Sequence, residues 1–467
     1  MLFFDTETNG LLDALDRVHC IRVYDAEKHV WHRFDRDHLP VELGVKMLMD
    51  ANVIVGHNAI DFDVPALSKV YPEFKPKRVL DTLVYGRLVY GDIKGADYGL
   101  FMKGLLPGNM IGRHSLESWG YRIGVLKGTY GKTTDWQEYD PEMGEYCERD
   151  VTVLLKLWDW LIKRRCSRAA LRTEMKVQAI ISRQCRFGFP FDVAAGEKLY
   201  AHLVEERIKI EQEAAKIFPP FWKWDSKVFK PKQNNARLGY RVGGDCCKIK
   251  LVEFKATSNQ HIYAYLRTKH GWEPEEFTEK SEVPAQWRHL FRSYYAARGI
   301  VGFPEPKIDD TILEKLTYPE APLLAKAAML QKRIGQLAEG QKGWLKVYNP
   351  KTGAIHGSIN TIGAVTRRMT HYDPNLAQVP AVYAPYGPEC RSLFGAFGPL
   401  QDWKLVGADA SSLEMMMLAH YLMPFDDGAF LKSVTQGKKE DGTDPHSINA
   451  KILGLSRDDA KTWFLTA

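Results

Sequence analysis

Short apolar segments alternate with helical sequence patterns over the first 165 residues, and this alternation strongly restricts the fold. The apolar segments at residues 2–4, 21–24 and 53–55 have the length and composition of buried strands. Residues 151–162 then carry the apolar spacing of a long helix. Strands that alternate with helices indicate an α/β domain.

The chain is longer than one hydrophobic core usually organises. It contains 467 residues, of which 45% are apolar and 12% aromatic. Because single cores stop growing at about 250–300 residues, we expect two or three domains. Composition changes place an α/β domain at 1–165, a mostly helical region at 166–340 with a basic, aromatic insert at about 217–257, and mixed α/β sequence at 341–467.

Charge and cysteine usage restrict the environment and the partners. Lys and Arg (64) exceed Asp and Glu (58), a mild excess that suggests a polyanionic partner without establishing one. The seven cysteines are scattered and lack the spacing of a zinc site, so we expect a reducing cytoplasm. No apolar run approaches the ~18 residues of a membrane span, and the N-terminus lacks a secretory pattern. We therefore expect neither export nor membrane insertion.

Acidic residues follow two of the apolar segments. Asp5 and Glu7 are alternate residues, so an extended backbone projects both side chains to one face. Asp63 follows the segment at 53–55, near the start of a predicted helix. Tyr146 and Asp150 are four residues apart, which places the phenol and the carboxylate on one helical face.

Four carboxylates that converge repel one another at pH 7 unless cations neutralise them. Carboxylate oxygens favour Mg²⁺ or Mn²⁺. Two such ions ~4 Å apart activate a water and stabilise the leaving oxygen in phosphodiester cleavage. The sequence therefore predicts a two-metal centre in residues 1–165, and the alternative is a set of unrelated surface acids.

A second group of candidate residues lies between 341 and 467. Residues 405–408 are apolar, and we expect a strand there that carries Asp409 and leads into a helix at 415–422. Arg457 and Lys461 are four residues apart, an arrangement suited to gripping a triphosphate, although such pairs are more often solvated.

The first set of motifs resembles the DEDD exonucleases of the tyrosine subclass. The resemblance implies a hydrolytic role for Tyr146, which would orient the attacking water. It selects Asp63 rather than the nearby Asp61, because the family places an aromatic residue directly before the ligand. The implied metal ligands are Asp5, Glu7, Asp63 and Asp150.

The order of motifs along the chain resembles family A DNA polymerases, above all the replicases of short-tailed phages of the T-seven type. Short sequence motifs similar to those of the family lie at residues 114–122, 188–192, 331–336 and 375–378. The resemblance implies an α/β fold class. An RNase H-like exonuclease domain (1–165) would precede a mostly helical thumb (166–340) and a truncated α+β palm with the start of the fingers (341–467).

The resemblance also assigns roles to the second group. Asp409 would bind both catalytic metals, and Glu414 would exclude the ribose 2′-hydroxyl. Each active site would use two Mg²⁺, with Mn²⁺ as an alternative. The implied partners are primer–template DNA, single-stranded 3′ ends and dNTPs. Primer or template would contact Arg368 and Gln378, and the incoming triphosphate would contact His446, Arg457 and Lys461.

Several positions depart from the family pattern. Met416 stands where the family has Arg, Leu465 where the finger helix has an aromatic residue, and Arg367 where a Thr-Gly-Arg segment has Gly. The second palm carboxylate of the family does not appear before the chain stops, shortly after Lys461. We therefore expect polymerisation to need a complementing C-terminal chain, unless the sequence is a fragment of a longer gene product.

Three interpretations of function remain. The first is a phage-type replicative DNA polymerase polypeptide with 3′–5′ proofreading exonuclease activity in the bacterial cytoplasm. The second is a stand-alone 3′–5′ exonuclease whose polymerase remnant holds DNA. The third is a non-enzymatic assembly subunit, against which the complete acidic set argues. Related phage replicases bind thioredoxin through a larger insertion, and for the shorter 217–257 segment we expect direct DNA contact rather than thioredoxin capture.

Overall fold

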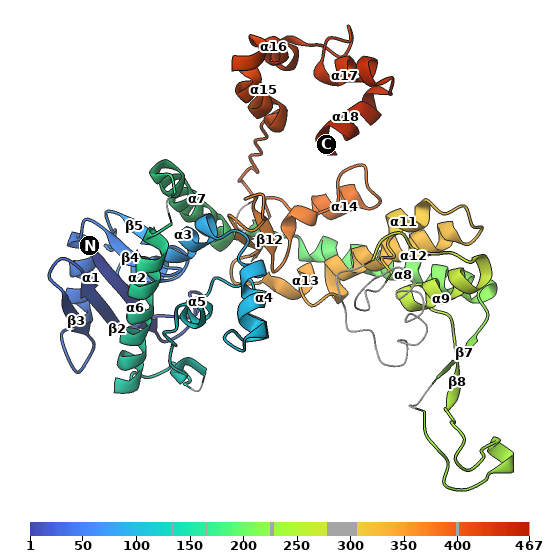
Figure 1. Ribbon diagram of the computed structural model, residues 1–467, viewed down its shortest axis with the longest axis horizontal. Coiled ribbons are helices and arrows are strands. Elements are labelled where there is room, and N and C mark those ends of the chain that lie inside the picture. The colour runs from blue at the N-terminus through green and yellow to red at the C-terminus, as the bar shows by residue number, and fades with distance from the viewer. Residues whose placement is uncertain (133, 165, 225–227, 278–305, 398–400, 467) are drawn as a thin grey trace. The chain divides into compact units, whose positions relative to one another are not determined.

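The computed structural model describes the chain except residues 133, 165, 225–227, 278–305, 398–400 and 467. The chain divides into two compact units, Met1–Asp402 and Trp403–Ala467 (Figure 1). Strands and helices alternate in the first 165 residues, as the sequence predicts. The domain boundaries expected at residues 165 and 340 stay predictions.

A five-stranded sheet organises the N-terminal part of the first unit. Its strand order is β3-β2-β1-β4-β5, with β1 in the centre. Strand β1 is antiparallel to β2 and parallel to β4, so the sheet is mixed. Two of the three apolar segments expected to be strands lie in β1 and β2, and the third, 53–55, overlaps β4. The strands are β1 (Leu2–Thr8), β2 (Val18–Asp25), β3 (Val30–Phe34), β4 (Ile54–Gly56) and β5 (Val79–Asp81).

Helices cover both faces of this sheet because successive residues of β1 point in opposite directions. Phe4 packs with Leu48 and Leu67 from α1 (Val41–Asp50) and α2 (Asp63–Val70). Phe3 belongs to a separate core that includes residues of the long helix α6 (Pro141–Ile162). Burial of each such side chain stabilises the fold by about 1.5–3 kcal/mol. The further helices here are α3 (Thr82–Val89), α4 (Lys94–Met102) and α5 (Leu116–Ile123).

Helix α6 begins earlier than the apolar pattern alone indicates. The Asp140 side chain accepts a hydrogen bond from the backbone N–H of Met143 at 2.9 Å, and Pro141 occupies the first turn. Both features are typical of helix N-termini. The helix therefore extends nearly three turns further than 151–162 in the N-terminal direction and carries Tyr146 and Asp150 within it.

A second core lies in the mostly helical part of the first unit. It is built around Leu203, Leu266, Leu324 and Leu330. One of its helices ends at Gly188, whose φ is 73°. The elements are α7 (Arg168–Phe187), α8 (Val193–Ile217), α9 (Asn259–His270), α11 (Asp310–Glu314), α12 (Ala321–Ile334), a π-helical turn (Gly335–Glu339) and α13 (Trp344–Val347).

Short strands connect these helices. The 217–257 segment contains an antiparallel strand pair, β7 and β8. A three-stranded sheet has the order β6-β10-β9, and β11 pairs with β12. The strands are β6 (Phe189–Pro190), β7 (Phe221–Trp224), β8 (Ile249–Val252), β9 (Tyr348–Asn349), β10 (Ala354–Ile355), β11 (Ser358–Asn360) and β12 (Thr370–Tyr372), and the last helix of the unit is α14 (Gly387–Ser392).

The second unit is helical where it is regular. The helix expected at 415–422 is confirmed within α15, but the strand expected to carry Asp409 is wrong: residues 403–410 have no regular structure. A strand needs a neighbouring strand for its backbone hydrogen bonds, and none of the described strands pairs with this segment, in which Val406 is 93% exposed. The helices are α15 (Leu413–Asp426), α16 (Ala429–Gln436), α17 (Pro445–Leu453) and α18 (Arg457–Thr466).

Throughout the described residues, every helix is either too short or too polar to cross a membrane.

Candidate active sites

Two acidic side chains of β1 form the centre of the first candidate site. Asp5 and Glu7 lie on the same face of the central strand and are both partly buried. Helix α6 packs on this face, and its Cys147 thiol donates to Asp5 Oδ2 at 3.6 Å. Asp5, Glu7 and Cys147 offer potential ligand atoms that all lie within 4.8 Å of one another.

The third carboxylate comes from the start of α2. Thr6 Oγ1 on β1 donates to Asp63 Oδ1 at 2.6 Å, and Asp63 is buried. Asp61 accepts hydrogen bonds from Gln178 on α7 instead, with Nε2 at 2.9 Å from each carboxylate oxygen. The structure therefore brings Asp63, and not Asp61, to the strand that carries Asp5.

The fourth carboxylate and the tyrosine come from α6. Asp150 and Tyr146 are both buried on the face that packs against the sheet. Lys127 Nζ lies 2.5 Å from Asp150 Oδ2 and 4.7 Å from the centre of the Tyr146 ring. Asp150 Oδ1 is buried and has no hydrogen-bond partner within the part of the chain that the structure describes.

The electrostatics couple these four carboxylates. Burial raises the pKa of Asp5 well above its usual value, and the charges of Asp63 and Asp150 raise it further. Burial, then the charge of Asp5, raises the pKa of Glu7. Burial also raises the pKa of Asp63 to about 6 and raises that of Asp150 despite Lys127. Four carboxylic acids in one partly buried site would ionise more readily beside a bound cation.

Lys127 and Cys147 are residues of this site that the sequence motifs do not reveal. Cys147 lies three residues before Asp150, so its position on the same helical face was a usable signal. Burial raises the pKa of its thiol, which therefore stays protonated and positions Asp5. Lys127 lies in an irregular segment after α5, and only the tertiary structure brings it to Asp150.

The expected palm residues do not form a cluster. Asp409 lies in the exposed irregular segment before α15, and Glu414 is exposed at the start of that helix. Among the described residues, the metal-type cluster is that of Asp5, Glu7 and Cys147, and it does not include Asp409. Met416 lies on α15, whereas the side chain of Leu465 is outside the described residues.

The residues expected to hold a triphosphate do lie close together. Asp444 caps α17 and forms an ion pair with Arg457 of α18, with Nη2 and Oδ1 2.9 Å apart. The pKa of His446 is lowered by burial and by the charge of Arg457, and to a smaller extent by that of Lys461. His446, Arg457 and Lys461 thus share one electrostatic environment.

The two residues expected to contact DNA lie in the first unit. Arg368 is exposed, and it follows Arg367, whose φ of 66° is in the left-handed region. The backbone carbonyl of Gln378 accepts a hydrogen bond from Gln336 Nε2 at 3.1 Å. Two of the segments that carry the sequence resemblance, 331–336 and 375–378, are therefore in direct contact.

Comparison with known proteins places the chain in a family. A model of DNA polymerase family A matches residues 290–461. The chain is 32% identical to the DNA-directed DNA polymerase of Enterobacteria phage T3, over 99% of this chain and 74% of that protein. It is 31% identical to the DNA-directed DNA polymerase of Escherichia phage T7 over the same shares.

A solved structure shows the same fold. The POL domain of Pol1 from M. smegmatis, in complex with DNA primer-template and dNTP, matches with a TM-score of 0.58 and 14% identity. The match covers 98% of this chain and 64% of that one, so the chain spans less than two thirds of its solved neighbour. With both phage relatives above 30% identity over nearly its whole length, the chain belongs to DNA polymerase family A.

Proposed function

We propose that this chain is a phage-type replicative DNA polymerase polypeptide whose first 165 residues are an RNase H-like 3′–5′ proofreading exonuclease. The convergence of Asp5, Glu7, Asp63 and Asp150 carries the nuclease proposal. These acids come from three separate segments, and their pKa values depend on one another. The sheet order β3-β2-β1-β4-β5, with the acids on its central strand, agrees with such a domain.

The residues of the site fit a pair of divalent cations. All four carboxylates offer hard oxygen ligands, and the buried Asp150 Oδ1 has no partner in the described part of the chain. We assign two Mg²⁺, with Mn²⁺ as the alternative, to Asp5, Glu7, Asp63 and Asp150. Bound there, the ions would activate a water and stabilise the leaving oxygen.

The protein's own groups would orient the reaction. Burial and the charge of Asp150 raise the pKa of Tyr146 to about 12, so the phenol keeps its proton at neutral pH and can hold a water by hydrogen bonding. Lys127 Nζ lies over its ring, 4.7 Å from the centre. Tyr146 would therefore position the attacking water rather than remove its proton.

Substitution of the acids tests the nuclease. We expect Asp5→Ala with Glu7→Ala to abolish Mg²⁺-dependent shortening of a single-stranded 3′ end and to leave DNA binding nearly unchanged, because metal ligands are lost but cations of the protein are not. Asp63→Asn should behave in the same way. Asp61→Asn is the matched control and should retain activity. Full nuclease activity in the double variant would refute the assignment.

We further propose that nucleotide incorporation uses Asp409 together with a carboxylate from polypeptide outside these 467 residues, on the same or on a separate chain. The phage relatives extend beyond the match, which covers 74% of each. Glu414 would exclude the ribose 2′-hydroxyl, and His446, Arg457 and Lys461 would hold the triphosphate. Arg368 and Gln378 would contact primer and template.

Primer extension separates this proposal from a stand-alone exonuclease. We expect extension when the C-terminal polypeptide of a related phage polymerase is added, and we expect Asp409→Ala to abolish it. No gain on mixing would favour the exonuclease with a DNA-holding remnant. Shortening of 3′ ends should be the same with and without the added C-terminal polypeptide, so the nuclease and polymerase activities are measured independently.

We propose direct DNA contact for the β7–β8 segment. Trp222 is 66% exposed on β7, and lysines surround the strand pair in the sequence. Exposed aromatic and basic side chains suit stacking on bases and pairing with phosphates. Stoichiometric retention of thioredoxin in a pull-down would contradict this proposal and would indicate that the segment captures thioredoxin instead.

A further inference from the structure

Helix α7 carries a row of cations that the proposed reactions do not use. Arg168, Arg172, Lys176 and Arg183 recur at spacings of four and seven residues, which places them on one helical face. All four side chains are exposed. Like charges four residues apart destabilise an isolated helix, and a bound polyanion would remove this destabilisation.

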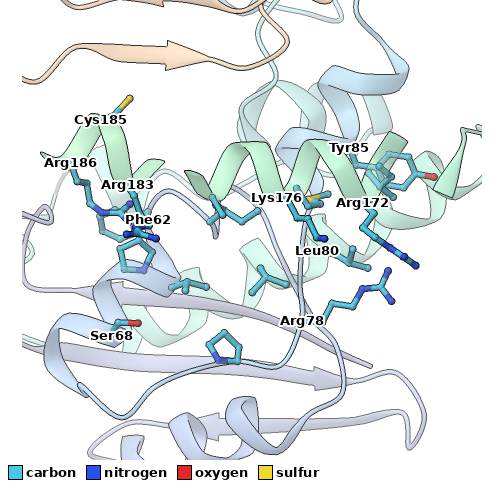
Figure 2. A pocket seen from close by; sticks show the side chains of 18 of the residues that line it. Phe62, Ser68, Arg78, Leu80, Tyr85, Arg172, Lys176, Arg183, Cys185 and Arg186 are labelled. Carbon is cyan, nitrogen blue, oxygen red and sulfur yellow. The ribbon is translucent and has the colours of Figure 1, made fainter. Parts of the chain in front are cut away.

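This row lines a groove that lies between α7, α2 and the edge strand β5. Figure 2 shows Arg172, Lys176, Arg183 and Arg186 on the α7 side and Arg78 on the opposite wall. The cavity measures about 1940 Å³, more than the roughly 300–1,000 Å³ typical of small-molecule sites. Its size therefore suits an extended, polymeric ligand.

The groove is lined mainly by positive charge. Nine Lys and Arg residues line it, against Asp13 as the single carboxylate. Five of these cations have no carboxylate of the described residues within ion-pair distance: Arg78, Arg168, Arg172, Lys176 and Arg183.

The floor of the groove is apolar. Val64 and Pro65 of α2, Val79 and Leu80 of β5, and Met175 of α7 all contribute to it. Asp5, Glu7, Asp63 and Asp150 are absent from the lining, so the groove is separate from the candidate nuclease centre. A cationic wall over an apolar floor offers phosphates and unpaired bases different surfaces.

We propose that this groove binds single-stranded DNA, with phosphates along the α7 row and bases against the apolar floor. Positively charged grooves that follow the backbone, combined with surfaces for bases, are the general design of single-strand binding. Cations four residues apart on a helix repeat about every 6 Å along its axis, which suits a regularly charged polymer. A duplex would keep its bases away from the floor. The proposal rests on membership of the polymerase family and not on the proposed nuclease.

Charge reversal in the full-length chain tests the groove. All variants carry Asp5→Ala with Glu7→Ala and are measured without divalent metal, so the result does not depend on whether the nuclease proposal holds. Binding of a labelled oligothymidylate is followed by fluorescence anisotropy over a range of salt concentrations. The test variant is Arg172→Glu with Lys176→Glu, and the control is Lys46→Glu with Lys103→Glu, two exposed cations outside the groove.

We expect the test variant to bind roughly tenfold or more weakly and the control to bind as the parent does. The slope of log affinity against log salt should fall in magnitude by about 1.4, because each lost single-strand phosphate contact removes about 0.7. Arg172→Gln with Lys176→Gln should give an intermediate loss with an unchanged unfolding midpoint, which excludes misfolding as the cause.

Three results would overturn the proposal. The first is an unchanged slope and affinity in the Arg172→Glu, Lys176→Glu variant. The second is an equal loss for duplex DNA, which would assign the groove to a double helix. The third is competition by polyglutamate as effective as that by oligothymidylate at equal charge, which would assign the groove to an acidic protein segment.

Discussion

Arg367 occupies a backbone conformation that favours glycine. Its φ is 66°, and a side chain in the left-handed region costs about 1–2 kcal/mol. The family resemblance expects Gly at this position, so the departure from the motif falls where a side chain is least favourable. The Arg367 guanidinium also donates to the backbone carbonyl of Leu88, and this hydrogen bond offsets part of the cost.

A pair of substitutions separates the backbone cost from the hydrogen bond. Arg367→Ala and Arg367→Gly both remove the guanidinium, but only Gly relieves the left-handed strain. We expect the Gly variant to have a free energy of unfolding about 1 kcal/mol higher than the Ala variant. Urea denaturation of both proteins measures the difference. Equal stabilities would mean that the strain is absent.

The buried ion pair of Arg22 and Asp35 makes stability depend on pH. Nη2 of Arg22 lies 2.6 Å from Asp35 Oδ2, and both side chains are buried. Burial alone would raise the pKa of Asp35, but hydrogen bonds from His38 and Arg22 outweigh it and lower the pKa to about 2. A carboxylate with a lowered pKa stabilises the folded state above its unfolded pKa, and this stabilisation is lost as the pH falls towards the folded value.

We therefore expect the free energy of unfolding to fall between about pH 4 and pH 2 by an amount on the order of 2 kcal/mol from Asp35. Asp35→Asn should be less stable at pH 7, because Arg22 loses its partner. Its free energy of unfolding should also fall less between about pH 4 and pH 2. Urea denaturation at several pH values measures both effects. An identical pH profile in the two proteins would contradict the assignment.

At the scale of elements, α6 lies close to the sheet because Gly144 has no side chain. A Cβ atom at this position would lie 2.1 Å from Arg22 Nη2 and 2.9 Å from the Tyr139 hydroxyl. Arg22 is held by Asp35 and cannot move away easily. The close contact sets the position of Tyr146 and Asp150, which lie about half a turn and nearly two turns further along α6.

Gly144→Ala should therefore move α6 away from the sheet. We expect a loss of about 1–3 kcal/mol in the free energy of unfolding, typical of overpacking, and weaker Mn²⁺ binding at the proposed nuclease site. Gly99→Ala in α4 is the matched control, because a Cβ there meets nothing within 4 Å. The free energy of unfolding of this control should rise by about 0.5–1 kcal/mol. Unchanged stability in Gly144→Ala would show that Arg22 can relocate at little cost.

At the scale of the whole molecule, the two units differ in how much apolar surface they bury. The four hydrophobic clusters lie in Met1–Asp402. In the described part of Trp403–Ala467, the buried apolar residues are Met415, Ala419, Pro445 and Ala460, whereas Phe425 is 86% exposed. Hydrophobic burial is the main stabilising contribution to folding, so the second unit has little to hold its helices in place.

Hydrogen exchange on the intact chain tests this difference. We expect the amides of α15 to α18 to exchange well before those of β1 and α6, because opening the second unit exposes little apolar surface. The first unit serves as the internal reference in the same sample. Comparable protection in both units would contradict the expectation.

The sequence by itself determined the alternation of strands and helices in the first 165 residues, and it singled out the acids that the fold brings together. Helix and strand periodicity are local, and so are the capping signals at Asp140 and Pro141, which means that nearby residues suffice to predict them. The strand expected before Asp409 failed because its hydrogen bonds depend on a partner strand elsewhere in the chain. The same local logic placed Asp63 near β1 only with help from the family resemblance.

Only the tertiary structure decided which distant residues meet. Lys127 pairs with Asp150, Gln178 donates a hydrogen bond to Asp61 and not to Asp63, and the cations of α7 line a groove with Arg78. None of these pairs has a sequence spacing that predicts contact. Charge and burial act through space, so their effects on pKa and binding follow from packing between segments rather than from local propensity.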